Sequence, residues 1–278
     1  MVKTEDSVAF IGRGALVGLA RAFAGAVIFS LPMLMTMELW SIGSYVPPLK
    51  VCVLLLVMLP LLVGLSKIAG FGPTSTLGDD VVDALVAVAV AAIVSTGVLW
   101  LFGIISPAMP ASEVIGKIAV QTFPGSLCAI LARSQLGTES VTQDRGGEES
   151  YPAALLTMAA GALFLGLNVA PTEEIVVLTY KMETWRIVVL ATLSLLLMHG
   201  FVYVASFRGA PEAVPGATLW TQFLRFTVVG YAMVLIISLY LLWTFGRTDA
   251  TSMNEIAGAC IVLGFPAALG AAASRLIL

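Results

Sequence analysis

Eight long apolar runs, separated by polar segments, make up most of the chain. Each run is close to the roughly 20 residues that an α-helix needs to cross the hydrocarbon core of a bilayer. The runs are approximately Leu16–Leu39, Val51–Phe71, Val81–Ile105, Glu113–Arg133, Pro152–Ala170, Arg186–Phe207, Gln222–Phe245 and Glu255–Leu278. The pattern predicts an all-α polytopic membrane protein of about eight transmembrane helices.

The first four runs resemble the last four in sequence. Across four aligned blocks, 29 of 77 positions are identical. Shared apolar residues inflate any comparison of membrane segments, but these matches also include Glu, Pro, Phe, Trp and Arg in one order. The fourth block, at Glu113–Arg133 and Glu255–Arg275, reads E-x-x-G-x-x-x-V-x-x-F-P-x-x-L-x-A-x-x-x-R in both copies. The sequence therefore predicts a tandem duplication of a four-helix unit.

The predicted duplication divides the chain into a first four-helix repeat at 1–133, a cytoplasmic linker at 134–151 and a second repeat at 152–278. The linker is rich in Gly, Ser and Glu, a composition typical of flexible segments. An insertion around Pro211–Pro215 lengthens the second copy. Because four is an even number, both units enter the bilayer in the same direction. We expect a parallel 4+4 repeat with its pseudo-two-fold axis along the membrane normal.

Composition supports the membrane class. Of the 278 residues, 59% are hydrophobic and 11% are charged, whereas soluble domains carry roughly 25% charged residues. The net charge is -3 and the basic residues are scattered, so nucleic acid is not an expected partner. The three cysteines lie in apolar runs, which does not indicate a disulfide framework.

The distribution of Lys and Arg predicts the orientation. With the N-terminus in the cytoplasm, nine basic residues fall at cytoplasmic ends of the runs and four at outer ends. Cytoplasmic loops carry the excess of basic residues in membrane proteins. We therefore expect both termini in the cytoplasm, and Trp40, Trp100, Trp185 and Trp243 near the outer interface.

Several sequence segments resemble those of a bacterial family of integral membrane proteins of unknown function. They are FSLPMLMTMELW, NVAPTEE, FLRFTVVGYA, LWTFGRTD and VLGFPAALGAAASRLIL. The similarity runs from about Arg13 to Leu278. The resemblance implies a multi-pass protein of the bacterial inner membrane, and it supplies no catalytic residues.

Two matched acids are the first candidates for an ion site. Glu38 and Glu174 occupy equivalent positions of the repeat, two residues after Thr36 and Thr172, and Glu173 precedes the second acid. We expect both acids at helix C-termini, where the dipole disfavours a negative charge by about 0.3–1 kcal/mol. Carboxylates and hydroxyls at this position would suit a cation. The alternative is a pair of solvated acids at the interface.

Four prolines are candidate sites of helix distortion. Pro32 and Pro171 precede the two acids, so each helix is expected to break shortly before its Glu. Pro124 and Pro266 follow a Phe in both copies of the fourth block. A proline inside a helix frees a backbone carbonyl one turn earlier. Such a carbonyl could line a cavity, or the kink could serve packing alone.

A second pair of acids, Glu113 and Glu255, begins the last helix of each repeat. Each follows a capping residue, Ser112 or Asn254, and a helix N-terminus favours an acid. Capping is therefore the simpler interpretation. These acids would nevertheless lie at the same outer end as the first pair, where four acids near one axis would concentrate cations.

Two further features occur in one copy only. Lys117 and Gln121 follow Glu113 at four-residue spacing, which makes a polar stripe on one helix face. His199, the single histidine, could relay protons or could hydrogen-bond a neighbouring helix.

These residues favour a small-ion channel or transporter, more readily for cations, with its path at or near the pseudo-two-fold interface. The alternative is a non-transporting scaffold, sensor or accessory subunit, which a dry interface between the halves would favour. No catalytic or nucleotide-binding motif occurs, so we expect neither an enzyme nor a cofactor, and no metal is assigned. The expected partners are the lipid bilayer and a small inorganic ion, and a homo-oligomer is compatible with the sequence.

Overall fold

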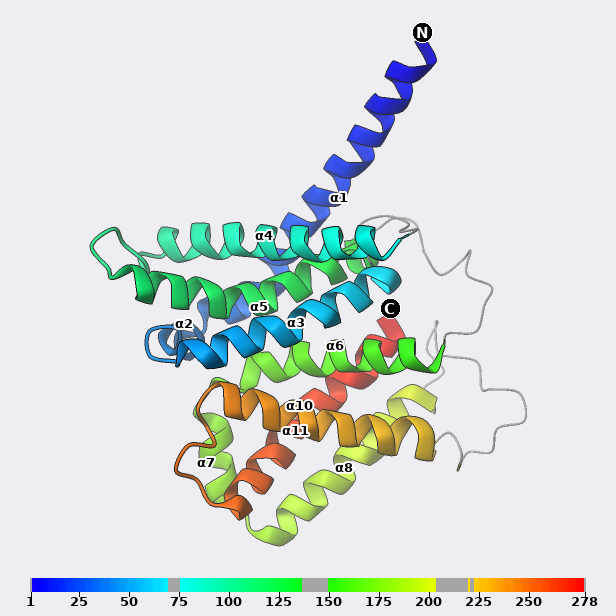
Figure 1. Cartoon of the computed structure of the whole chain (residues 1–278). Helices are drawn as coiled ribbons and strands as arrows, with labels where there is room; N and C mark the ends of the chain where they lie inside the picture. The colour runs from blue at the N-terminus through cyan, green and yellow to red at the C-terminus, as the bar shows by residue number, and fades with distance from the viewer. Residues whose placement is uncertain (1, 70–75, 137–149, 204–219, 221–222, 278) are drawn as a thin grey trace.

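Long apolar helices build the whole protein, as its computed structural model shows (Figure 1). The structure describes residues 2–69, 76–136, 150–203, 220 and 223–277. Within these residues there is no strand, and eight helices are long and apolar enough to span a membrane. The predicted all-α fold with about eight spans is confirmed.

The helices are bounded as follows. The first half contains α1 (Val2–Met35), α2 (Met37–Ile42), α3 (Pro48–Ala69), α4 (Leu77–Leu101) and α5 (Ala111–Leu136). The second half contains α6 (Tyr151–Val169), α7 (Glu174–Lys181), α8 (Thr184–Tyr203), the π-helix η2 (Phe223–Val228), α10 (Val229–Thr244) and α11 (Met253–Ile277). Because α5 is helical to Leu136, the first residues of the predicted linker belong to a helix. The rest of the linker up to 149 and the Pro211–Pro215 insertion lie outside the described residues.

The eight long helices are packed side by side with alternating direction. The short helices α2 and α7 and the turns that join α4 to α5 and α10 to α11 lie together at one end of the bundle, at the left of Figure 1. We call this end the α2/α7 end. The C-terminus lies towards the opposite end. With eight spans, the chain ends on the side of the bundle from which the first span begins.

The last helix of each half is its central helix. α5 packs against α1, α3 and α4, and α11 packs against α6, α8 and α10. Every residue from Gln121 to Ile130 is buried. Small residues allow this packing, because a Cβ on Gly161 would overlap the backbone of Gly270 in α11. α5 and α11 therefore determine how the other spans are arranged around them.

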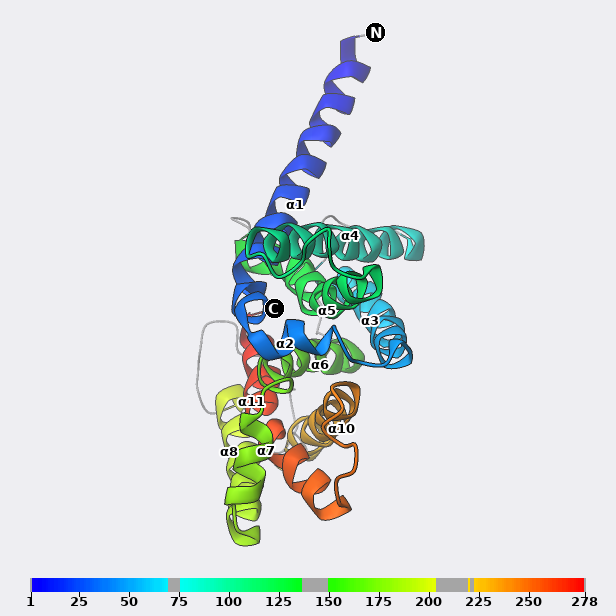
Figure 2. The ribbon, with the colours of Figure 1, turned by 90° about the vertical axis from the view of Figure 1, so that its left-hand side faces the viewer.

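The two halves meet along α6, which lies between them when the helices are viewed end-on (Figure 2). α6 contacts α1, α3 and α5 of the first half, and α10 contacts α3. One hydrophobic core runs through both halves, and it includes Met58, Phe123, Leu163 and Leu241. The side chains at the boundary between the halves are thus largely apolar.

Both halves contain their elements in one order: a span, a short helix and three further spans. This order is what a tandem duplication would produce. The duplication and its axis along the membrane normal remain predictions from the sequence.

Candidate functional site

Both matched acids of the first pair lie at the start of a short helix. Glu38 is in the first turn of α2, and Glu174 is the first residue of α7. Our expectation that they end a helix was wrong, because the chain breaks at Thr36 and between Val169 and Glu174 and then resumes as helix. At these positions the helix dipole favours a negative charge, so the acids occur at no local electrostatic cost.

The two threonines bond to the helices that precede them. Thr36 donates its hydroxyl to the carbonyl of Pro32 at 2.7 Å, and Thr172 donates to the carbonyl of Val169 at 2.7 Å. A carbonyl in the last turn of a helix has no partner within that helix, and these hydroxyls supply one. The threonines therefore stabilise the two helix ends.

The pKa of Glu174 is lowered from its ordinary value of 4.5. The largest cause is the N–H of its own backbone, and the charge of Arg247 acts in the same direction. Glu173, at the N-cap of α7, is exposed, as is Glu174. Among the described residues, no hydrogen bond or ion pair joins an acid of one half to an acid of the other.

The predicted breaks before Glu38 and Glu174 are present, but the prolines act differently in each. Pro32 lies inside α1, which continues for three more residues to Met35. Pro171 lies outside any helix, is buried, and accepts a hydrogen bond on its carbonyl from the guanidinium of Arg247. Arg247 follows α10, so this hydrogen bond joins the α6–α7 break to the α10–α11 turn within the second half.

Pro124 and Pro266 do not interrupt their helices. α5 and α11 continue for at least two turns beyond them. Phe123, which precedes Pro124, is 1% exposed and packs in the common core. Phe123 thus packs in the core, and both interpretations of the two prolines stay hypotheses.

The polar stripe of α5 forms the most concentrated set of charged and polar contacts in the first half. Lys117, which is 4% exposed, lies with its Nζ 2.8 Å from a carboxylate oxygen of Glu113. The same ammonium donates to the carbonyl of Ile104 at 3.3 Å and lies 5.7 Å from the ring centroid of Trp40. Glu113 also accepts a hydrogen bond from Ser44 at 3.0 Å. A buried charge is thus held by groups from α2, α5 and two connecting segments.

Gln121 extends the stripe one turn deeper. Its side chain is fully buried, and its amide nitrogen donates to the carbonyl of Met33 at 3.3 Å, in the last turn of α1. Its amide oxygen Oε1 is buried and has no hydrogen-bond partner among the described residues. A buried acceptor without a partner costs about 1–3 kcal/mol. This oxygen is therefore a buried acceptor with no partner among the described residues.

Close backbone packing brings the end of α2 to the stripe. A Cβ on Gly116 would overlap the carbonyl oxygen of Gly43, which follows α2. In the second half, a Cβ on Gly258 would lie 3.0 Å from Thr179 of α7. In each half, a glycine of the central helix thus lies against the short helix or the residue that ends it.

The second half has no counterpart of the stripe. Glu255 accepts from the backbone N–H of Ser252 at 3.0 Å, and Ser252 accepts from the N–H of Glu255 at 3.4 Å. The capping residue is therefore Ser252 and not Asn254, because α11 begins two residues earlier than expected. In the first half α5 begins at Ala111, so Ser112 lies inside the helix and is not its cap. Ala259 and Leu263, at the positions of Lys117 and Gln121, are buried apolar residues.

His199 bonds to a neighbouring helix. Its Nδ1 lies 2.9 Å from the hydroxyl of Thr227 in η2, and its ring packs edge-on against Phe223 at 5.2 Å. A π-helical turn is an irregularity that often occurs at functional positions. This geometry agrees with the hydrogen-bonding interpretation of His199, and proton relay stays a hypothesis.

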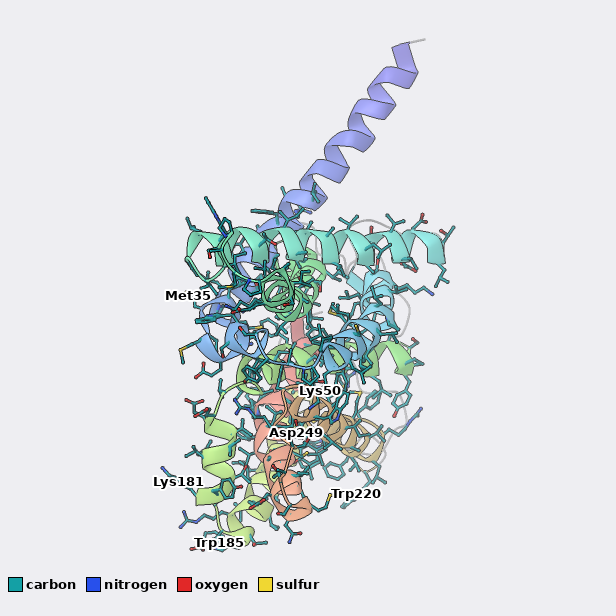
Figure 3. All side chains as sticks on the ribbon, turned by 60° about the vertical axis from the view of Figure 1, so that its left-hand side comes forward. Met35, Lys50, Lys181, Trp185, Trp220 and Asp249 are labelled. Carbon is teal, nitrogen blue, oxygen red and sulfur yellow. The ribbon has the colours of Figure 1, made fainter. Side chains whose placement is uncertain are left out.

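One ion pair between the halves was not predicted from the sequence. The ammonium of Lys50, at the start of α3, lies 3.1 Å from Asp249, which follows α10. Figure 3 shows the two residues next to each other. Lys50 also lies 5.4 Å from the ring centroid of Trp243. The alignment of the two halves could not predict this pair, because Asp249 falls in a turn between two aligned blocks.

Comparison with known proteins identifies the family. A family model described as "Putative integral membrane protein (DUF2391)" matches residues 18–278. No curated protein and no solved structure matches the chain. The matched region contains all eight spans and both short helices. The chain therefore belongs to this family of integral membrane proteins.

Proposed function

We propose that this integral membrane protein moves a small inorganic ion, more readily a cation than an anion, with access through the polar stripe of α5. One observation carries the proposal: an ammonium–carboxylate pair and a buried amide oxygen without a partner share one face of a membrane-spanning helix. Charged residues within spans are costly to insert and commonly mark ion pathways. Their presence in only one half argues against a purely structural requirement of the repeat.

Charge at the α2/α7 end supports a cation. Seven described acids occur there, against five described bases. The acids are Glu38, Glu113, Glu173, Glu174, Glu183, Asp249 and Glu255, and the bases are Lys50, Lys117, Lys181, Arg186 and Arg247. An excess of negative charge raises the local concentration of cations. The unpaired acceptor on Gln121 also suits a cation, since it has no proton to offer an anion.

We propose an access route in the first half rather than between the halves. Apart from the pair of Lys50 with Asp249, the boundary between the halves is largely apolar. The stripe, in contrast, borders the broken end of α1, where Gln121 bonds the carbonyl of Met33. Non-helical backbone at a break in a spanning helix provides carbonyl ligands in many transporters. A cation would displace the ammonium of Lys117 from Glu113 and would be coordinated by the free amide oxygen of Gln121.

Flux measurements on purified protein in liposomes test this function, with a panel of Na⁺, K⁺, Ca²⁺, H⁺ and Cl⁻. Gln121→Leu introduces the residue type of the matched position in the second half. It should lower cation flux about tenfold, as expected for the loss of one polar ligand. Thr122→Val is the matched control, because the hydroxyl of Thr122 bonds only the carbonyl of Ile118 in its own helix. Equal flux from parent and Gln121→Leu would contradict the proposed route.

The apolar boundary between the halves favours a second candidate, a membrane scaffold, sensor or accessory subunit that transports nothing. The core is continuous across the halves, and Glu174 is exposed. The same liposome panel discriminates the candidates. A folded parent protein that moves none of the five ions supports the scaffold and rules out the transporter for those ions.

A further inference from the structure

An apolar groove lies between the halves, beside the contact of α3 with α10. It has a volume of about 290 Å³ and is lined by Val57, Met58, Leu61, Phe123, Leu163, Ile236, Ile237 and Tyr240. Phe123 and Leu163 are buried, whereas Val57 is 47% exposed and Ile236 is 68% exposed. The groove therefore opens at the lipid-facing surface of α3 and α10.

The ion pair between Lys50 and Asp249 lies on the same surface. Lys50, Val57 and Leu61 are seven and four residues apart on α3, which places them on one helix face. On the other side, Trp243 lies three residues after Tyr240 of the groove and stacks on it at 6.4 Å between centroids. Lys50 lies above Trp243 at 5.4 Å. A continuous surface thus leads from the charged pair into the groove.

The depth of each part matches the layers of a phospholipid. At 1.5 Å per residue, Val57 lies about 10 Å and Leu61 about 16 Å along α3 from Lys50. The polar layer on each side of a bilayer is roughly 5–8 Å thick, from a total of about 40–45 Å and a hydrocarbon core of about 30 Å. Lys50 begins its span, so the charged pair lies at headgroup depth and the groove at acyl-chain depth.

The charges at the top of the groove are complementary to a zwitterionic headgroup. Lys50 and Asp249 together carry no net charge, so they do not attract a purely anionic group strongly. A phosphate beside Lys50 and an ammonium beside Asp249 would instead give each residue a further partner of opposite charge. The side chain of Asp249 is 66% exposed, which leaves its carboxylate open to a second partner. The side chain of Lys50 is 12% exposed, and its ammonium has three N–H donors, so a phosphate would share it with Asp249.

We propose that the groove binds one acyl chain of a phosphatidylethanolamine-type lipid, whose phosphate contacts Lys50 and whose ammonium contacts Asp249. α3 and α10 contact each other beside the groove, which makes it too narrow for another helix of about 10–12 Å diameter. The bound lipid contacts both halves and stabilises their association. This binding site is independent of any ion transport.

The first test is native mass spectrometry of the purified parent protein after exchange into detergent with equal amounts of phosphatidylethanolamine and phosphatidylglycerol. One phosphatidylethanolamine per chain should remain bound, with about a tenfold preference, as expected for one charge-assisted contact. Equal retention of the two lipids, or retention of neither, would overturn the proposal.

Two independent variants separate the headgroup from the groove. The double change Lys50→Gln with Asp249→Asn removes the charges, and Leu61→Trp fills the groove. Each should lower phosphatidylethanolamine retention about tenfold or more. The matched controls are Lys181→Gln, an exposed lysine of α7, and Leu196→Trp, a 62% exposed leucine of α8. Retention at the parental level by both test variants, or an equal loss in the controls, would overturn the proposal.

Discussion

At the scale of single residues, Lys117 shows how the first half accommodates a charge inside a span. Its ammonium bonds Glu113 and the carbonyl of Ile104 and lies beside the ring of Trp40. Breaking a buried ion pair leaves an uncompensated charge, which is strongly destabilising. These contacts come from different segments, so Lys117 also helps to order the α4–α5 turn relative to α2.

Glu174 gives a prediction for the dependence of stability on pH. Its pKa is lowered by its own backbone N–H and by the charge of Arg247. The stability that it contributes is therefore complete above its ordinary pKa of 4.5 and is lost as the pH falls through the lower folded value. Glu174→Gln should lower Tm at pH 7, and the difference from the parent should narrow as the pH falls below about 4.5.

The measurement for this prediction is Tm across pH in detergent, with Thr36→Val as the control. The hydroxyl of Thr36 donates only to the carbonyl of Pro32, so its Tm difference should not change with pH. If the Tm curves of Glu174→Gln and the parent run parallel across this pH range, the carboxylate of Glu174 does not contribute the expected stability.

At the scale of elements, the two broken helices bring the short helices α2 and α7 against the central helices. The sequence predicts the breaks, because proline precedes both acids. It could not predict that helix resumes at once, since α2 has only six residues and forms through tertiary packing rather than its own propensity. Because both acids begin a short helix, the helix dipole favours the charges of Glu38 and Glu174, whereas a position at the end of a helix would disfavour them.

Gly116 is the point where α5 and the end of α2 approach most closely. A Cβ there would overlap the carbonyl oxygen of Gly43. Gly116→Ala should therefore force the two segments apart and destabilise the protein by about 1–3 kcal/mol. Reversible unfolding in mixed detergent measures the difference.

Gly97 of α4 provides the matched control, because nothing lies within 4 Å of a Cβ added to it. Gly97→Ala should be neutral, or stabilising by about 0.5–1 kcal/mol through helix propensity. A Gly116→Ala variant as stable as the Gly97→Ala variant would show that the close contact is absent.

At the scale of the whole molecule, the count of spans and their alternation follow directly from the hydrophobic pattern. The sequence could also predict the ion pair of Lys117 with Glu113, because both lie on one helix face. It could not predict the pair of Lys50 with Asp249 or the groove beside it. Those depend on how the two halves pack, and no local pattern encodes that contact.

Orientation in the membrane is predicted from the distribution of basic residues. Reporters fused after Leu278 or inserted near Arg145 should be cytoplasmic, and one inserted in the segment Ser106–Pro110 should be outside. Enzymatic reporters active on only one side of the membrane measure this. The reverse pattern would place the α2/α7 end in the cytoplasm.

A comparison of the matched acids Glu113 and Glu255 tests the proposed access route for cations most directly. Glu113 and Glu255 are matched in sequence, yet of the two only Glu113 pairs with an ammonium, on the helix face that also carries Gln121. In liposomes, Glu113→Gln should reduce cation flux about tenfold, whereas Glu255→Gln, which alters a capping box, should leave it within about twofold of the parent. Equal effects of the two changes, or no effect of Glu113→Gln, would contradict the account.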